Sequence, residues 1–177
     1  MSKPRLVAYI AASLDGYIAT VDGGVEWLEA FEGGDYGYAQ FMAGVGSIVM
    51  GRATFDQVME MGEWPYTDTP TTVLTHRPLT DDPPPGVSIS DDINRIMEDA
   101  AQTGGDVWIL GGPEVLGQFL KADAIDRIDL FVMPVLLGEG IPLFGPDGNV
   151  QGVTLDACLP YPDGVVKLSY LLRAGRE

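Results

Sequence analysis

The stretch Asp106–Leu120 constrains the fold of this chain more than any other part of the sequence. It opens with a short, continuous apolar run rich in β-formers, Val107–Leu110, which is typical of a strand buried on both faces. Two glycines end the run, and Pro113 has the fixed φ that suits the first position of a helix, with Gly112 as an acceptable N-cap. The apolar positions that follow at helical spacing are Val115, Leu116, Phe119 and Leu120. The stretch therefore predicts a buried strand, a tight turn and a helix that packs back onto the sheet.

A junction of strand, two glycines and helix has two interpretations. Residues without side chains let a ligand touch the backbone, and the free N–H groups and dipole at the start of a helix favour an anion there. The glycines can equally serve only the geometry of a tight turn. Both interpretations stay open for this stretch taken alone.

The composition indicates one folded domain that spans residues 1–177. A hydrophobic fraction of 46% fits a globular protein, and no apolar run approaches the length of about 18 residues that a membrane span needs. Leu6–Ala12 is apolar and follows two cations, but no small-residue cleavage site comes after it, so we expect a first strand rather than a signal peptide. The only cysteine, Cys158, permits no internal disulfide and indicates a cytoplasmic protein.

The charge balance limits the partners that the protein can have. A formal net charge of −16 argues against binding to nucleic acid or to anionic membrane surfaces. The acidic residues are spread along the chain, as on a solvated surface. Because lysine and arginine are scarce, few side chains can meet an anionic ligand, and the positions of these few are informative.

Apolar segments of strand-like composition alternate with short helical patterns through the first two thirds of the chain. The predicted strands are Arg5–Ala12, which is nearly all apolar and so central, Ser47–Met50, Thr71–Thr75 and Val87–Ile89. A first helix carries Tyr38, Phe41 and Met42, with Asp35 placed as its N-cap and an end near Gly44. Two further helices carry Phe55, Val58 and Met59, and Ile93, Ile96, Met97 and Ala100, the latter capped by Ser90 or Asp91.

The last part of the chain reads as strands alone. Ile128–Leu137 is a long apolar run with Pro134 inside it, which points to an edge strand or a bulge. Val153–Cys158 and Val165–Arg173 are predicted to be two final strands, antiparallel about Pro160–Gly164. Together these patterns predict an α/β fold: a mostly parallel central sheet with antiparallel C-terminal strands and flanking helices.

Three predicted strand ends carry features that suit an anion. They are Gly51-Arg52-Ala53-Thr54, Thr75-His76-Arg77 and Gly111-Gly112. In an open α/β sheet, ligands bind beyond the carboxyl ends of the strands. Each junction is ordinary by itself, but together they suit a ligand with two phosphate regions, a pyrophosphate at the helix starts and a further phosphate at the cationic pair.

Four segments, in this order, resemble the dihydrofolate reductase-like superfamily. They are Ser13–Ala19, Val49–Phe55, Ile109–Gly112 and Pro134–Phe144. They are most similar to the branch that includes the pyrimidine reductase domain of the bifunctional riboflavin-biosynthesis deaminase-reductase, and Asp35–Tyr38 with Glu63–Tyr66 look like its small stand-alone members. The resemblance covers nearly the whole chain, and it implies a three-layer fold and NADPH as hydride donor.

The resemblance also implies where NADPH binds. Gly51, Arg52 and Thr54 would hold the pyrophosphate region, and Leu74, Thr75, His76 and Arg77 would flank the adenosine, with His76 or Arg77 on its 2′-phosphate. Gly111, Gly112, Pro113, Glu114 and Val115 would lie along the diphosphate and nicotinamide ribose, while Ala11, Ile18 and Ala19 would border the nicotinamide. The family's Gly-Gly peptide is usually cis. Pro113 departs from the commoner glycine or serine and removes one N–H donor.

Long stretches without cations limit the substrate. No Lys or Arg lies between Arg5 and Arg52, between Arg52 and Arg77, or from Phe131 to Val166, and the resemblance implies that these segments build the substrate side. Folate reductases hold the glutamate of folate with an arginine that Ala53–His76 lacks, and the phosphate of the riboflavin-pathway substrate would also want a cation. An unpaired anion in a dry pocket costs about 2–5 kcal/mol. We therefore expect a neutral or cationic substrate, unless a partner subunit supplies the charge.

Two carboxylates are candidates for supplying the proton that reduction of a C=N or C=O bond requires. Counted back from Gly51 without gaps, Asp35 lines up with the carboxylate that folate reductases use, although it also fits an N-cap. Asp15 follows the first strand and should lie near the nicotinamide, although Asp15-Gly16 is also a turn signal. The aromatic residues that either wall a pocket for a planar substrate or belong to the core are Trp27, Tyr38, Phe41 and Phe55.

Two functions remain open for this sequence. The favoured one is an NADPH-dependent reductase of a small planar or cyclic C=N or C=O compound, neither folate nor a phosphorylated pyrimidine. The alternative is a non-catalytic NADP(H)-binding or sensor protein on the same scaffold. His76 is the only histidine, which argues against a histidine-based metal site. The resemblance suggests a homodimer through the late strands, where the apolar run Leu130–Leu137 is available.

Overall fold

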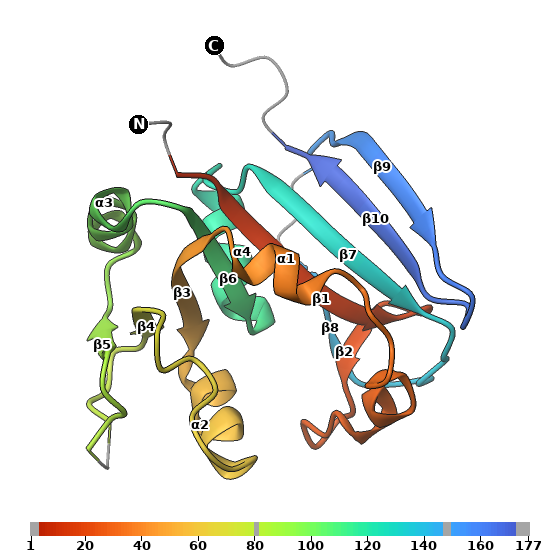
Figure 1. The fold of residues 1–177 in the computed structure, drawn as a ribbon, viewed down its shortest axis with the longest axis horizontal. Helices are drawn as coiled ribbons and strands as arrows, with labels where there is room; N and C mark the ends of the chain where they lie inside the picture. Colours follow the sequence, from red (N-terminus) through yellow and green to blue (C-terminus); the bar gives the residue numbers. More distant parts are fainter. Residues whose placement is uncertain (1–3, 80–81, 147–149, 173–177) are drawn as a thin grey trace.

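The computed structural model describes residues 4–79, 82–146 and 150–172, and it is built around an eight-stranded sheet (Figure 1). The order of strands across the sheet is β5-β4-β3-β6-β1-β7-β10-β9. Its strands are β1 (Leu6–Ser13), β3 (Val45–Gly51), β4 (Thr71–Leu74), β5 (Val87–Ser90), β6 (Asp106–Gly111), β7 (Arg127–Met133), β9 (Thr154–Pro160) and β10 (Val166–Leu171). β1 lies between β6 and β7, which confirms the central position predicted for the first strand.

The direction of the strands is also as predicted. β1, β3, β4, β5, β6 and β7 run parallel to one another, whereas β10 pairs antiparallel with both β7 and β9. Parallel neighbours need a long crossover, and the helical segments between these strands supply it. β9 and β10 are joined by a short turn in which the Gly164 N–H donates to the Tyr161 carbonyl oxygen, so they can pair antiparallel.

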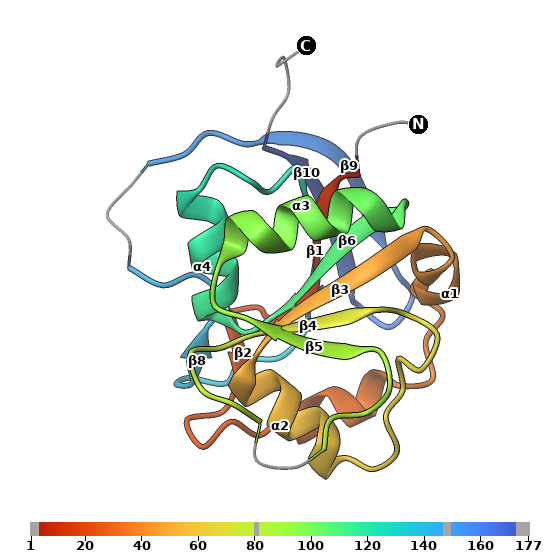
Figure 2. The ribbon, with the colours of Figure 1, turned by 90° about the vertical axis from the view of Figure 1, so that its left-hand side faces the viewer.

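Helices cover the sheet on both faces (Figure 2). They are α1 (Tyr38–Met42), α2 (Arg52–Glu60), α3 (Ile93–Thr103) and α4 (Pro113–Lys121), with a 3₁₀ helix, η1 (Glu26–Phe31). α3 and α4 bury Ile96 and Phe119 against one face, while α1 and α2 pack Phe41 and Phe55 against the other. The fold is therefore the three-layer arrangement of the dihydrofolate reductase-like proteins. None of the helices in the described ranges is long and apolar enough to cross a membrane.

Two predicted helix caps are wrong in position. α1 begins after Gly37, which has a left-handed φ of 80°, and Asp35 instead accepts a hydrogen bond from the Gly37 N–H at 3.0 Å. α3 is capped by Asp92, which accepts from the Asn94 N–H at 2.8 Å. In both places an aspartate accepts a hydrogen bond from the backbone N–H two residues further on. The predicted type of side chain is therefore correct, but the helix starts at a different residue.

Pro134 lies just beyond β7 rather than inside a strand. β7 is an interior strand between β1 and β10, so the predicted edge or bulge is wrong. Pro134 has no N–H to continue the ladder, and the apolar residues after it leave the sheet. The Val135 carbonyl there accepts a hydrogen bond from the Leu14 N–H at 2.8 Å, which connects the loops that follow β7 and β1.

Three short elements are absent from the sequence-based prediction. β2 (Tyr17–Ala19) and β8 (Ile141–Pro142) pair antiparallel as a separate two-stranded sheet, and η1 follows β2. Strands of three and two residues are too short to display an alternating pattern. η1 has no capping side chain that could mark its start.

Candidate functional site

The carboxyl ends of the parallel strands lie along one edge of the sheet, and those of β1, β3, β6 and β7 point towards the bottom of Figure 1. This edge is where open α/β sheets bind their ligands. α2 starts at Arg52, directly after β3, and α4 starts at Pro113, just after β6. β4 ends at Leu74, immediately before the segment with His76 and Arg77. The three junctions identified in the sequence are thus brought to the same edge.

The starts of α2 and α4 touch each other. A Cβ added to Gly51 would lie 3.0 Å from Val115 Cγ2 and 3.7 Å from the Gly112 nitrogen. A Cβ added to Gly112 would lie 3.5 Å from Thr54 Oγ1. Glycine at these two positions therefore lets the two helix starts approach each other closely, with no side chain over their first-turn N–H groups. The Gly111–Gly112 peptide bond is cis, as the resemblance implies.

The helix starts offer backbone N–H donors. The two N-caps, Gly51 and Gly112, have no side chain to bond the N–H groups of the first turn. Both helices have nine residues, so their free N–H groups and dipoles favour an anion at this position. Pro113 has no N–H, so α4 contributes fewer donors than α2. We call this pair of helix starts, residues 51–54 and 111–115, the glycine cradle.

Arg52 connects the glycine cradle with the segment after β4. Its Nε donates to the two carboxylate oxygens of Asp56 at 2.8 and 2.9 Å. A terminal nitrogen of the same guanidinium donates to the Pro78 carbonyl oxygen at 3.0 Å. Arg52 therefore holds the chain that follows Arg77 against α2, and only part of its guanidinium remains for a ligand.

The cationic pair His76-Arg77 is exposed at the same edge. Arg77 makes no ion pair with any residue in the described ranges. His76 Nδ1 lies 3.8 Å from Asp91 Oδ2, a carboxylate that the sequence analysis does not connect with the site. Asp91 follows β5, and only the pairing of β5 with β4 brings it there, so the one available signal is its place at a parallel strand end. Asp91 offsets part of the positive charge and leaves Arg77 as the freer cation.

The residues expected beside the nicotinamide lie near the end of β1 but on different faces of the sheet. Ala11 packs with the aromatic cluster under η1, and Ile18 packs against the core under α4. Ala19 is buried at the end of β2, next to the short strand β8. Near the adenosine positions, Thr75 Oγ1 accepts a hydrogen bond from the Arg77 N–H at 3.2 Å.

The Asp15 carboxylate is occupied by structural hydrogen bonds. It accepts from the Ser13 hydroxyl at 2.6 Å and from the backbone N–H groups of Leu137 at 3.1 Å and Gly138 at 2.7 Å. The hydrogen bond from Ser13, together with these backbone donors, lowers the pKa of Asp15 below its ordinary value of 3.8. Asp15 therefore ties the loop after β1 to the loop after β7 and is ionised at neutral pH, which does not suit a proton donor.

Asp35 is exposed and lies beside aromatic side chains. Its Oδ1 accepts the Gly37 N–H, and its Oδ2 accepts no hydrogen bond from a residue in the described ranges. Burial raises the pKa of Tyr9, and the negative charge of Asp35 is among the charges that add to this effect. The Tyr9 hydroxyl also donates to the carbonyl oxygen of Tyr36, the residue after Asp35, at 3.2 Å, so Asp35 lies near the side of β1 that carries Tyr9.

The aromatic candidates do not form one wall. Trp27 lies in the cluster under η1, and Phe55 lies in the cluster under α2. Tyr38 and Phe41 both contact Tyr9, whose ring stacks on Phe41 with centroids 4.1 Å apart. Tyr9 is missed by the sequence analysis, because β1 is almost entirely apolar and shows no alternation that would mark its two faces.

Lys167 corrects one premise about the substrate side. The stretch from Phe131 to Val166 has no cation, but Lys167 is the next residue, and its Nζ lies 5.4 Å from the ring centroids of both Tyr9 and Phe131. Arg127, on the adjacent strand β7, shares the carboxylate of Asp129 with it. The face covered by α1 therefore does carry cations, which come from strands distant in the sequence.

These features define the class of protein. A sheet of this strand order, with glycine-capped helix starts at its carboxyl edge and antiparallel strands at its C-terminal end, is the dihydrofolate reductase-like fold. Residues 4–167 match the family model of the RibD C-terminal domain, so the chain belongs to that family.

Known proteins agree with this assignment. The chain is 40% identical to the uncharacterised protein YwjB of Bacillus subtilis (strain 168) over 143 residues, which cover 79% of this chain and 82% of YwjB. The crystal structure of a putative riboflavin biosynthesis protein from Shewanella sp. PV-4 superposes with a TM-score of 0.83 at 30% identity, over 94% of this chain and 98% of that one. A dihydrofolate reductase from Enterococcus faecalis, solved with NADP(H) and RAB-propyl, has a TM-score of 0.69 at 23% identity over 96% of both chains.

Proposed function

We propose that the protein is an NADPH-dependent reductase that transfers a hydride to a small planar or cyclic compound with a C=N or C=O bond, neither folate nor a phosphorylated pyrimidine. The observation that supports this most is the glycine cradle, where two helix starts touch and neither cap has a side chain. The Enterococcus faecalis dihydrofolate reductase, which shares the fold, was solved with NADP(H).

The residues at the carboxyl edge fit a dinucleotide with an extra phosphate. Gly51 and Gly112 leave room for a diphosphate, which the first-turn N–H groups and the Thr54 hydroxyl would bind. Arg77, which has no ion-pair partner in the described part of the chain, would bind the 2′-phosphate. The single cysteine, Cys158, is free, which fits the expected cytoplasmic location.

Bound NADPH would supply the hydride, and the chain would supply orientation and a proton. We assign the proton to Asp35 rather than Asp15, because Asp15 is held ionised by three hydrogen bonds. Asp35 would act directly or through one water on the atom next to the reduced carbon. Trp27, in the apolar cluster with Ala11, would exclude water from the reacting atoms.

Titration of tryptophan fluorescence with NADPH and NADH tests this proposal. We expect NADPH to bind with micromolar affinity and NADH about tenfold more weakly, because a charge-assisted pair with Arg77 is worth about 1.4 kcal/mol or more. Arg77→Met removes the preference. Lys121→Met is the control, since Lys121 is an exposed cation at the last residue of α4, at the other end of that helix from the edge.

Equal binding of both nucleotides would remove the role of Arg77, and binding of neither would overturn the proposal. A panel of pteridines, pyrimidinones and imines then separates the two open functions by oxidation of NADPH. Binding without oxidation by any of them would favour the non-catalytic sensor.

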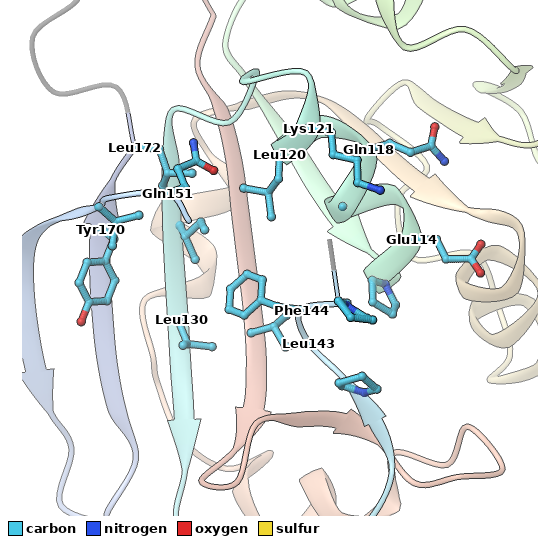
Figure 3. Close-up of a pocket in the computed structure, with 17 residues that line it drawn as sticks. Glu114, Gln118, Leu120, Lys121, Leu130, Leu143, Phe144, Gln151, Tyr170 and Leu172 are labelled. Atoms are coloured by element: carbon cyan, nitrogen blue, oxygen red, sulfur yellow. The ribbon is translucent and has the colours of Figure 1, made fainter. Parts of the chain in front are cut away.

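We propose, in addition, that the protein is a homodimer. β9 is the edge strand of the sheet, and all of its seven residues are exposed, with Leu155 exposing 53% of its surface. Beside it lies an apolar groove of about 730 Å³ between α4, β7 and β10 (Figure 3). Figure 3 shows Leu120, Leu130 and Phe144 pointing into this groove. An exposed edge next to an apolar surface favours coverage by another chain.

A second copy is the occupant that we propose, because identical strands can pair antiparallel about a two-fold axis. Edge pairing alone buries little of the roughly 800 Å² per partner that a stable dimer needs, and the groove adds apolar area. Size-exclusion chromatography with light scattering should give twice the monomer mass, and Leu155→Glu should shift it to monomer. Leu14→Glu, at an exposed leucine outside the groove and β9, should leave it unchanged. A monomeric wild type would contradict the dimer.

A further inference from the structure

A second cavity, of about 420 Å³, lies under α1 at the amino end of the sheet. Its lining comes from β1, α1, β7, β9 and β10, and it includes Arg5, Arg127 and Lys167 together with the rings of Tyr36, Phe41 and Tyr161. No part of the glycine cradle lines it. We call it the amino-end cavity.

The amino-end cavity and the carboxyl edge use different residues. Val7 lines the cavity at the amino end of β1, and Lys167 lines it further along the sheet, where it pairs with Phe131 and so lies level with Ala11, two residues before Ser13. The ring of Tyr9 lies between these levels and contacts Phe41 and Phe131, with centroids 4.1 and 4.7 Å away. None of the residues expected to bind the nucleotide lines the cavity.

Positive charge is concentrated in this cavity. Three of the seven lysines and arginines in the described ranges line it, although the chain as a whole has a net charge of −16. Its lining has two carboxylates: Asp106 pairs with Arg5, and Asp129 pairs with both Arg127 and Lys167. Asp156, which pairs with Arg127 at 3.3 Å, lies outside the lining.

Lys167 is the least satisfied of these cations. Its side chain is only 20% exposed, and its one ion pair among the described residues, with Asp129 Oδ2, is long at 3.4 Å. Asp129 is already engaged, because Arg127 Nε and Ser169 Oγ donate to its Oδ1 at 2.8 and 2.6 Å. The remaining neighbours of the Lys167 ammonium are the faces of Tyr9 and Phe131. A mostly buried ammonium with N–H donors to spare is costly unless an acceptor reaches it.

The walls of the cavity limit the shape of a ligand that could accept a hydrogen bond from Lys167. Phe41, Tyr36 and Tyr161 offer ring surfaces, and Leu159 adds an aliphatic one. Arg5 sits at the rim, 59% exposed, with its guanidinium forked onto Asp106. The Lys167 ammonium, with N–H donors to spare between flat apolar walls, matches a single negative charge on a flat ligand.

We infer that the amino-end cavity binds a small planar monocarboxylate, with the carboxylate on Lys167 and the ring between Phe41 and the two tyrosines. The cavity shares no residue with the glycine cradle, but it includes Tyr36 and Gly37, which follow Asp35, so it adjoins the side of the proposed reductase site that holds the proton donor. Its ligand differs in charge and size from a dinucleotide, and its cations are Arg5, just before β1, Arg127 on β7 and Lys167 on β10.

Sodium benzoate is the probe, and benzamide is its neutral control of the same shape. In ¹H–¹⁵N spectra at constant ionic strength, benzoate should cause saturable shifts of the amides around the cavity, such as Val7, Gly37 and Gly44. Benzamide should bind at least about tenfold more weakly, because it cannot accept as an anion. Lys167→Met keeps the stem and removes the charge, and it should weaken benzoate about tenfold or more.

Lys121→Met is the matched control, since Lys121 lies on α4 on the opposite face of the sheet and should leave benzoate binding unchanged. If Lys167→Met lowers the melting temperature strongly, Arg5→Met at the exposed rim serves instead and should weaken benzoate more than benzamide. Equal binding of the two probes would overturn the site. So would shifts centred on Thr54 and Gly112, unchanged binding by Lys167→Met, or no saturable shift at all.

Discussion

The two ends of the central sheet present positive charge in different ways. At the carboxyl edge the donors belong to the backbone, since the caps Gly51 and Gly112 leave helix N–H groups without a side-chain partner. At the amino end the donors belong to side chains, and Arg127 and Lys167 share the buried carboxylate of Asp129. One end is built from two helix dipoles, the other from ion pairs.

This difference indicates which substitutions disturb binding and which disturb folding. Backbone N–H groups do not titrate, and a methyl group added next to them blocks a ligand without removing a contact of the core. Partly buried ion pairs depend on each other, so the loss of one member leaves the others without compensation. Mutations at the carboxyl edge should therefore act on ligand affinity, and those at the amino end on stability.

The largest effect is expected at Asp35, which belongs to the segment that joins the two regions. Asp35→Asn should lower turnover by about 10²- to 10⁴-fold, because the amide keeps the size of the side chain but cannot transfer the proton. NADPH affinity should stay unchanged, since Asp35 is not part of the glycine cradle. The measurement is the rate of NADPH oxidation with the best substrate of the panel, and Glu32→Gln is an exposed control nearby. Unchanged turnover would restrict Asp35 to its turn with Gly37.

The next effect tests the amino end. Asp129→Asn should lower the free energy of unfolding by about 3–5 kcal/mol, because Arg127 and Lys167 would lose the carboxylate that compensates them in a largely buried setting. Denaturant titration measures this. Asp99→Asn is the control, since Asp99 pairs with Arg95 at 3.8 Å on the surface and should change stability by less than about 0.5 kcal/mol. A small change in the free energy of unfolding by Asp129→Asn would contradict the expectation that substitutions at the amino end act on stability.

Gly112→Ala tests the carboxyl edge, where we expect a loss of ligand affinity and little loss of stability. Its Cβ would lie 3.5 Å from Thr54 Oγ1, which is ordinary contact, so the fold should persist. The methyl group would stand in the glycine cradle, and loss of a hydrogen bond to a charged phosphate should weaken NADPH about 30-fold, or about 2 kcal/mol. Gly117→Ala, on the same helix with open space around it, should leave NADPH affinity unchanged. Equal affinities for the two variants would separate the cradle from cofactor binding.

The same comparison explains what the sequence can predict. The carboxyl edge is visible because its parts are consecutive: Gly51-Arg52 and Gly112-Pro113 each follow an apolar run, and parallel strands bring their ends together. The central position of β1, the parallel strands, the antiparallel C-terminal strands and the starts of α2 and α4 followed from these local patterns and from the family resemblance. Elements of two or three residues, such as β2 and β8, did not, because they have no period to detect.

The amino end is not visible in the sequence for a physical reason. Arg5, Arg127 and Lys167 are distant along the chain, and only the neighbouring positions of β1, β7 and β10 unite them. Tyr9 was hidden inside an apolar strand, and Asp91 depends on the pairing of β5 with β4. Side-chain clusters across strands therefore require the sheet order and register, whereas backbone sites at strand ends do not.

Asp15 combines a charged side chain with backbone N–H donors, because its carboxylate accepts hydrogen bonds from Leu137 and Gly138. We expect the smallest effect from a substitution at this position. Asp15→Asn should lower the melting temperature modestly at neutral pH, since the amide accepts the Leu137 and Gly138 N–H groups less strongly than a carboxylate does. The Ser13 hydrogen bond and these donors lower the pKa of Asp15 in the folded protein below the ordinary 3.8 of the unfolded chain. Its contribution is therefore complete above that value and is lost as the pH falls through the lower, folded-state pKa.

The difference in melting temperature between the wild type and Asp15→Asn should accordingly shrink as the pH falls well below 4, because the wild-type carboxyl group is then protonated too. Calorimetric scans over this range measure the difference, and Glu139→Gln, an exposed acid in the same loop, should show no such trend. A constant difference at all pH values would indicate that the side chain acts by shape alone. In that case Asp15 would lose its charge-dependent anchoring role at the carboxyl edge, and the assignment of the proton to Asp35 would lose its main support.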